Sequence, residues 1–259
     1  MATTKKITKV EGAVPPSSTE KGGGVFVASA ENKAKAKQLR LFALLAWIIA
    51  MAGQAFAIFK LLHDETLVYL IITIVVILAL AITGSYLWKK ANRLDPASEK
   101  DKFRFFVQNQ LGAILGVLAF LPMVILILTS KDMNKQSKGI AGAIAVVALL
   151  IAGITGIDFN PPSIEQYTEQ IREVELLNNG MDHVYWTKSG SKFHLFSDCS
   201  YINTDRTSEI FEGTVPQARE LKNITELCSR CRDRSLKEQG MTEEDLKTKL
   251  IERLADTIR

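Results

Sequence analysis

Residues 67–88 read LVYLIITIVVILALAITGSYLW, a run of 22 residues without an acidic or basic side chain. An α-helix rises about 1.5 Å per residue, so this run spans roughly 33 Å, enough to cross the hydrocarbon core of a bilayer. Further apolar runs at residues 39–62, 105–129 and 140–157 also reach or approach this length. Four such runs joined by short charged loops are typical of membrane spans and not of buried helices in a soluble protein. We therefore expect a four-helix transmembrane domain over residues 33–157.

Charge is distributed unevenly along the chain. Residues 1–157 carry 18 Lys+Arg against 9 Asp+Glu, whereas residues 158–259 carry 14 against 19. The basic excess flanks the apolar runs, where it sets topology. The C-terminal part is the only one large enough to bind a duplex, and it is acidic, so nucleic acid is disfavoured as a partner. The predicted fold is a membrane all-α bundle followed by a small α+β domain.

The flanking cations also predict the orientation. Ten Lys and Arg residues flank the start of the first run (Lys33, Lys35, Lys37 and Arg40) or lie between the second and third runs, against four in the other two loops. The more basic side faces the cytoplasm, and an even number of spans returns the chain to it. The first run is too long for the apolar core of a signal peptide and is preceded by a long polar stretch, so we expect it to be retained. The chain is predicted to be a multi-pass protein of a bacterial cell membrane with both termini cytoplasmic.

Small residues recur every three or four positions in three of the runs, which places them on one face of each helix. Apolar side chains gain little by leaving lipid for one another, so membrane helices associate where small residues let their backbones approach closely. These faces are expected to join the helices of one bundle or to contact a homo-oligomer or another protein, although small residues also occur at background frequency. The stripes are Ala43, Ala46, Ala50, Gly53 and Ala57; Gly112, Gly116 and Ala119; and Ala141, Ala145, Ala148 and Ala152.

Polar side chains are few within the runs. They include Gln54 and the sequence Gln108-Asn109-Gln110, and Pro122 interrupts the third run. An amide in hydrocarbon needs a hydrogen-bond partner, and a proline kinks the helix and frees a carbonyl. Interhelical bonds with a kink and a transport site remain two open interpretations. The lack of intramembrane carboxylates argues against a proton- or sodium-coupled pump.

The segments outside the runs differ in character. Residues 1–32 hold too few apolar side chains for a core and are expected to be a disordered cytoplasmic tail. Residues 158–180 begin with a double proline and continue with helical spacing, which predicts a linker helix that either couples the bundle to the domain or acts as a spacer. An amphipathic helix is expected over residues 241–259, with Thr242 and Asp245 in a capping box. Residues 181–240 remain as a separate domain.

All three cysteines of the chain fall in that domain, and Cys228-Ser-Arg-Cys231 has the spacing of a metal-binding knuckle. His194 lies five residues before Cys199, after the predicted hairpin Val184–Phe193. Three thiolates and one imidazole complete a tetrahedral shell with no position for water, which is typical of structural zinc. We therefore expect residues 181–240 to be a zinc-module domain, the core of a small α+β cytoplasmic zinc-binding domain. The cytoplasm keeps thiols reduced, so a cytoplasmic location favours a bound metal over a disulfide. Two alternatives remain: an incidental dithiol beside a buried cysteine, and a redox pair, which the missing βαβ pattern disfavours.

Residues 184–231 resemble a family of small zinc modules found at the ends of bacterial proteins, and are distantly similar to the metal-binding module of Ada-type DNA-repair proteins. The shared order is an aromatic strand, a turn, a histidine and cysteine, and a C-x-x-C pair. The chain departs from it in two places, because the histidine and cysteine are one residue further apart and Leu227 replaces a proline. The resemblance covers about fifty residues. It implies zinc bound by His194, Cys199, Cys228 and Cys231, and no catalysis.

Motifs for phosphate-binding loops, nucleophile elbows, zinc proteases and dinucleotide folds are missing from the sequence. We therefore expect no enzyme, and no catalytic or cofactor-binding residues. The first hypothesis is a membrane-anchored protein whose zinc domain serves protein interaction or regulation. The second is an oligomeric channel or pore-forming effector gated by the cytoplasmic domain, and the third is a small-solute transporter.

Overall fold

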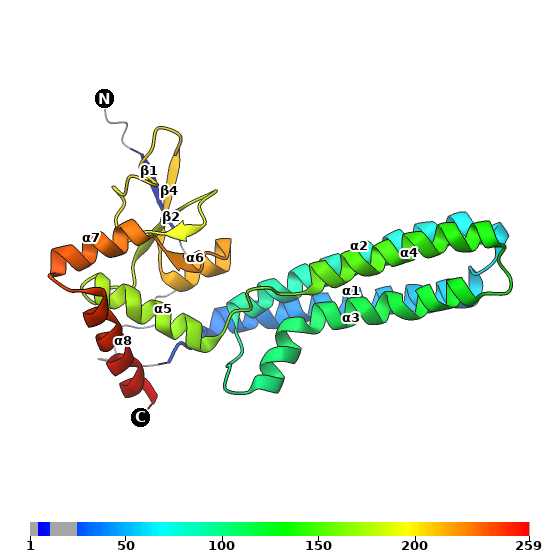
Figure 1. Cartoon of the computed structure of the whole chain (residues 1–259), viewed down its shortest axis with the longest axis horizontal. Coiled ribbons are helices and arrows are strands. Elements are labelled where there is room, and N and C mark those ends of the chain that lie inside the picture. The colour runs from blue at the N-terminus through cyan, green and yellow to red at the C-terminus, as the bar shows by residue number, and fades with distance from the viewer. Residues whose placement is uncertain (1–4, 11–24, 259) are drawn as a thin grey trace. The chain divides into compact units, whose positions relative to one another are not determined.

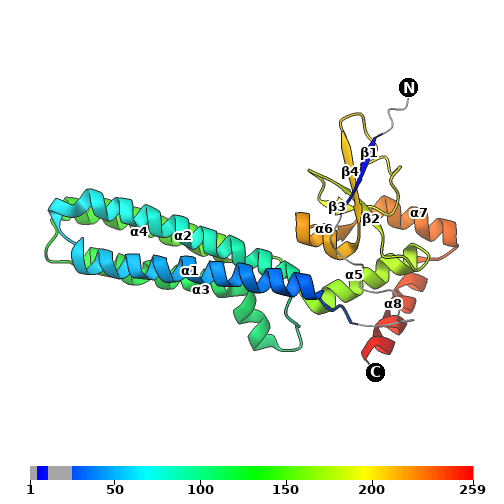
Figure 2. The same ribbon diagram turned by 180° about the vertical axis from the view of Figure 1, so that it is seen from behind.

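The computed structural model describes residues 5–10 and 25–258, and the chain divides into two compact units. The helical unit comprises Glu31–Pro161, and the C-terminal unit takes in the described residues before and after it. The helical unit consists of α1 (Ala30–Lys60), a 3₁₀ turn (Asp64–Thr66), α2 (Leu67–Leu94), α3 (Lys102–Thr129) and α4 (Lys135–Gly156). Figures 1 and 2 show its four long helices running alongside one another.

All four helices are long and apolar enough to cross a membrane, which confirms the four predicted apolar helices. Much of their apolar surface points away from the bundle. Phe59 is 79% exposed, Val68 66% and Ile154 60%. Apolar patches on this scale are not sustained in water by a soluble monomer, whereas lipid solvates them. The exposed faces therefore suit a bilayer and argue against buried helices of a soluble core.

The small residues lie where the helices meet. Ala43, Ala50 and Ala57 of α1 are almost completely buried, as are the four alanines of the α4 stripe. A Cβ atom added to Gly116 of α3 would stand 3.1 Å from the carbonyl oxygen of Ala152 in α4. These stripes thus bring the helices of a single chain into close contact. Because they are already covered, they leave little room for the expected contact with a second copy.

Pro122 leaves a gap in the hydrogen bonding of α3, and α1 fills it. Proline has no N–H, so the carbonyl of Leu118, four residues earlier, lacks its helical donor. The side-chain amide of Gln54 donates to this carbonyl at 3.3 Å, and Gln54 itself is only 8% exposed. Of the two interpretations of these residues, the contact favours interhelical bonding over a transport site.

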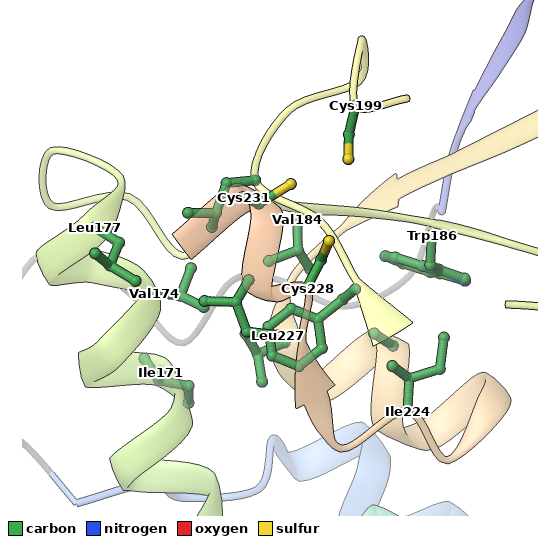
Figure 3. Close-up of a cluster of buried hydrophobic side chains, with 14 of the residues drawn as sticks. Ile171, Val174, Leu177, Val184, Trp186, Cys199, Ile224, Leu227, Cys228 and Cys231 are labelled. Carbon is green, nitrogen blue, oxygen red and sulfur yellow. The ribbon is translucent and has the colours of Figure 1, made fainter. Parts of the chain in front are cut away.

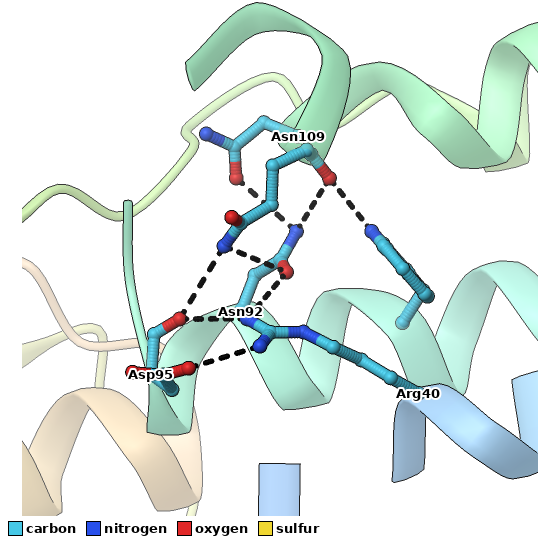
Figure 4. A network of polar contacts seen from close by, with 6 residues as sticks. Arg40, Asn92, Asp95 and Asn109 are labelled. Carbon is cyan, nitrogen blue, oxygen red and sulfur yellow. Dashed lines mark hydrogen bonds and ion pairs between the residues drawn. The ribbon is translucent and has the colours of Figure 1, made fainter. Parts of the chain in front are cut away.

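A second polar network joins α1, α2 and α3 near one end of the bundle (Figure 4). Arg40 donates to a carboxylate oxygen of Asp95 at 2.9 Å. The amide of Asn92, which has no exposed surface, donates to the Gln108 carbonyl at 2.9 Å and to the Asn109 side chain at 3.2 Å. The predicted polar sequence in α3 is therefore engaged in holding helices together.

The C-terminal unit contains two small sheets and four helices. Strand β4 (Glu209–Gly213) is central in the first sheet, between β1 (Lys6–Lys9), parallel to it, and β2 (Val184–Thr187), antiparallel to it. Strands β3 (Lys192–Phe193) and β5 (Glu226–Leu227) pair in parallel. The helices are α5 (Ile164–Leu177), α6 (Val215–Lys222), α7 (Ser229–Gln239) and α8 (Glu243–Ile258).

Helix α5 belongs to the core of the C-terminal unit. The side chain of Ser163 caps its first turn by accepting from Gln166 N at 3.0 Å. Its inward face carries Tyr167, Val174 and Leu177, which are at most 3% exposed and pack in one cluster with the strands and α7 (Figure 3). The helix was expected to be a linker. Its apolar face instead packs on this domain, because the domain's strands alone are too short to enclose a core.

The N-terminal segment differs from the expected disordered tail at both of its described parts. Lys6–Lys9 form the strand β1, and Phe26 and Ala28 are buried in the core of the C-terminal unit. The Phe26 ring meets that of Tyr167 edge to face, with centroids 4.8 Å apart. Residues 11–24 lie outside the described residues. Phe26 and Ala28 are thus added to a core that the rest of the domain supplies.

The C-terminal helix α8 begins as its sequence predicts. The Thr242 hydroxyl accepts from Asp245 N at 3.1 Å, and the Asp245 carboxylate accepts from Thr242 N at 2.8 Å. These reciprocal bonds are the capping box. The apolar stripe of the helix includes Leu246, Leu250 and Leu254. Leu246 is 5% exposed within the core cluster, and the other two leucines are partly buried, so this face packs on its own domain.

Candidate metal centre

The predicted hairpin places the histidine of the candidate site. Strands β2 and β3 flank the turn, and just past β3 the backbones of Tyr185 and His194 exchange two hydrogen bonds of 2.7 Å. Because side chains alternate along a strand, this register decides which face His194 occupies. The His194 side chain is 4% exposed. The hairpin thus holds the imidazole inside the domain.

Cys199 reaches the same place from the irregular segment that follows β3. Its N–H donates to the Phe196 carbonyl at 3.2 Å, and its own carbonyl accepts from Ile202 and Asn203. These turns fold the chain back so that the thiol, 6% exposed, points inward. Four residues between His194 and Cys199 are enough for this return.

The C-x-x-C pair lies where β5 passes into α7. Cys228 N donates to the Phe193 carbonyl at 2.9 Å, which ties the knuckle to β3. The Cys228 carbonyl then accepts from Cys231 N at 3.1 Å and from Arg232 N at 3.0 Å as α7 begins. One helical turn brings both thiols to one side, and they are 2% and 1% exposed. Figure 3 shows the labelled cysteines from these separate segments beside the core.

The four predicted residues come together. One ligand atom from each of His194, Cys199, Cys228 and Cys231 lies within 4.8 Å of all the others. A tetrahedron with metal–sulfur distances of ~2.3 Å and a metal–nitrogen distance of ~2.0 Å has edges of about 3.5 Å and 3.8 Å. The Cys231 Sγ and His194 Nδ1 atoms are 3.7 Å apart. The widest pair exceeds such an edge by at most about 1 Å, so small side-chain shifts suffice and the set could hold a metal ion.

The electrostatics of the site suit ligation. Burial raises the pKa of the Cys231 thiol to about 12, and hydrogen bonds from the Phe196 and Leu195 N–H groups offset part of that increase. Burial also lowers the pKa of His194 to about 4, and the nearby Lys192 charge acts in the same direction. The imidazole is therefore neutral, as a ligand must be, and the buried thiolates require a cation to be stable. A thiolate–imidazolium pair of the kind used by cysteine nucleophiles is disfavoured here.

The Leu195 and Phe196 N–H groups were not identified from the sequence as part of the site. Both point to the Cys231 sulfur, and amide donors of this kind orient and stabilise metal-bound thiolates. Backbone donors carry no side-chain signature, so only their position after the histidine could have indicated them.

The other histidines of the chain lie outside the cluster. His183 Nε2 is 3.4 Å from a carboxylate oxygen of Glu212, and His63 precedes the 3₁₀ turn of the helical unit. The three cysteines are free thiols, so the described residues hold no disulfide at this site. A search of protein-family models, curated proteins and solved structures finds no match to this chain.

Proposed function

We propose that the chain is a multi-pass membrane protein that presents a zinc-stabilised domain at the cytoplasmic face for protein interaction or regulation. The observation that carries the proposal is the buried Cys₃His cluster beside the core of the C-terminal unit. Cys199 follows β3, and Cys228 and Cys231 lie where β5 passes into α7. One ion bound by this cluster would therefore tie the hairpin, the following turns and α7 together.

The donor set favours zinc and a structural role. Three sulfurs and one imidazole suit zinc, whereas magnesium and calcium prefer oxygen ligands. Four protein ligands fill a tetrahedral shell and leave no position for a reactive water, which is the arrangement of structural sites. The likeness to Ada-type modules points in the same direction and concerns the same four residues.

The cytoplasmic placement is supported by the flanking charges and by the thiols. Ten cations lie on the side assigned to the cytoplasm and four on the other. Three free cysteines are also consistent with a reducing compartment, where thiols do not form disulfides.

Interaction is preferred to conduction because the polar groups of the bundle have protein partners. Gln54 is bonded to Leu118, Asn92 to Gln108 and Asn109, and the Gln110 amide donates to the Asp158 carbonyl at 3.1 Å. A channel or a solute site would need such groups to face a wet path. Their engagement between helices supports a scaffold that carries the domain.

Zinc content tests the proposal. The full-length chain, purified in mild detergent, is expected to contain about one zinc per chain by elemental analysis. Cys228→Ser should lower the content severalfold, whereas His183→Ala, a matched control outside the cluster, should leave it unchanged. Zinc near zero in the parent chain, or equal zinc in the parent and Cys228→Ser chains, would refute the metal site.

Ion flux separates the interaction role from the channel. Liposomes that contain the purified chain should show no conductance above that of empty liposomes. A steady single-channel current that disappears when a residue of the helical unit is substituted would instead establish the channel hypothesis.

A further inference from the structure

The strand β1 comes from the opposite end of the chain to its neighbour. It pairs in parallel with β4, with Lys6 opposite Glu209 and Lys9 opposite Glu212. The pairing makes β1 the outer strand of its sheet, so β4 has β2 on one side and β1 on the other. The edge of β4 is therefore covered by a segment about 200 residues away in sequence.

Backbone bonds and charge hold β1 in place, and burial contributes little. None of the side chains of Lys6–Lys9 is buried, and Ile7 is 47% exposed. Beyond the strand, Val10 N donates to the Glu212 carbonyl at 3.0 Å, and the Gln217 amide donates to the Val10 carbonyl at 3.3 Å. A strand without a buried side chain is among the first elements of a domain to open.

The contacts that the Lys6, Thr8 and Lys9 side chains make with β4 are polar and complementary. The ammonium groups of Lys6 and Lys9 each lie 3.6 Å from a carboxylate oxygen, of Glu209 and Glu212 respectively. The Thr8 hydroxyl also donates to Glu209. Both lysine side chains are more than three-quarters exposed, so these ion pairs add selectivity for cationic side chains and little stability.

We infer that the β4 edge is a binding site for an extended peptide with two lysines three positions apart, and that β1 occupies it in cis. Strand addition to a sheet edge is a general mode of peptide recognition, with affinity from backbone bonds and specificity from side chains. Glu209 and Glu212 supply that specificity here. The inference rests on the proposed interaction role and names the kind of partner that would fill it.

The tether of β1 sets how strongly it competes. Fourteen residues, 11–24, connect Val10 to Val25. Because β1 belongs to the same chain, its pairing with β4 is intramolecular, with an effective concentration on the order of 1 mM. With a Kd of about 0.1 mM for β1 itself at the open edge, a competing partner peptide would bind the intact chain roughly tenfold more weakly than the open edge. Release of β1 would leave the β4 edge free to bind the partner peptide.

The test compares the full-length chain with a full-length variant that lacks residues 1–10, both in detergent. The probe is a fluorescein-labelled peptide with the sequence of residues 4–11, Thr-Lys-Lys-Ile-Thr-Lys-Val-Glu. Fluorescence anisotropy should show saturable binding to the truncated chain and about tenfold weaker binding to the intact one. A control peptide with Val10→Pro lacks the N–H that bonds Glu212 and should bind severalfold more weakly.

A charge swap tests the role of the glutamate. Glu209→Lys in the truncated chain should weaken binding of the parent peptide by about threefold, and a peptide with Lys6→Glu should recover it. Equal binding to intact and truncated chains, or no binding to the truncated chain, would overturn the inference. A truncated chain that fails to fold, judged by hydrogen exchange in α5, would also overturn it, because β1 would then be an integral strand. If intact chains form a dimer that dissociates when residues 1–10 are removed, the occupant of the β4 edge is β1 of a second copy and not a partner peptide.

Zinc is measured on the same samples. Peptide binding by a chain without zinc would refute the proposed metal role alone, whereas stoichiometric zinc without peptide binding would refute this inference alone.

Discussion

Replacing Gln54 with leucine is expected to weaken the attachment of α1 to α3, because it leaves the Leu118 carbonyl without a donor inside the bundle. The bond is 3.3 Å long and involves a side chain that is 8% exposed. Interhelical hydrogen bonds in membrane proteins contribute on average about 0.6 kcal/mol and at most about 1.7 kcal/mol. The carbonyl has no alternative helical donor, so we expect the cost to lie in the upper part of this range, near 1.5 kcal/mol.

The reason for that cost is Pro122, and a double-mutant cycle isolates it. Pro122→Ala restores an N–H four residues after Leu118, so the helix can satisfy its own carbonyl. In this background Gln54→Leu should cost less than about 0.3 kcal/mol, which leaves a coupling energy of roughly 1 kcal/mol between positions 54 and 122. Both residues belong to the helical unit, whereas the candidate metal centre belongs to the C-terminal unit.

The free energy of unfolding would be measured by titrating the detergent-solubilised chain with sodium dodecyl sulfate and following helical circular dichroism. Thr73→Val serves as the matched control, because its hydroxyl donates at 2.8 Å to the Tyr69 carbonyl within its own helix. That change should cost little and show no coupling to Pro122. If Gln54→Leu costs the same with proline and with alanine at position 122, the reasoning is refuted.

Three further outcomes are expected. Gly156→Ala should destabilise the bundle by about 1–3 kcal/mol, because the new Cβ would stand 2.5 Å from Ala113 N. Gly153→Ala is the control and should be neutral or slightly stabilising, because the space around Gly153 is open. Equal unfolding curves for the two variants would contradict this prediction. Burial raises the pKa of Asp182 to about 7 from its usual 3.8, so its contribution to stability is largest below about pH 4 and is lost as the pH rises through 7. Hydrogen exchange in the C-terminal unit, corrected for intrinsic rates, should therefore quicken over that range, and Asp182→Asn should remove this part of the pH dependence; an unchanged profile would refute the assignment. Chelation of zinc should raise exchange around Cys228 and leave the helical unit unaffected, and uniform exchange before and after chelation would argue against a structural ion.

Much of the architecture follows from local sequence. An apolar run of about 20 residues has few stable solutions other than a membrane-spanning helix, so the four helices could be placed from hydropathy alone. The cap at Thr242 was equally local, since it depends on a residue three positions away. The four candidate ligands could be chosen because few residue types bind metal through sulfur or imidazole, and their spacing allows convergence.

Partners distant in the sequence could not be predicted in the same way. The short strand β1 has one apolar residue in four, and its pairing with β4 depends on an edge that exists only after the rest of the domain has folded. Helix α5 showed an apolar face in the sequence, but a periodic face does not specify the surface it packs against. The amide of Gln54 likewise gave no sign that its acceptor would be the carbonyl freed by Pro122.

The sequence by itself determined which segments are long and apolar enough to cross a membrane and which side chains can ligate a metal, because both depend on the chemistry of residues close together in the chain. Only the tertiary structure decided that the small-residue stripes close one bundle, that the N-terminal segment completes a sheet, and that His194 and three cysteines lie within 4.8 Å of one another. Those outcomes depend on the packing of segments far apart in sequence, where many pairings are chemically possible and the shared core selects one.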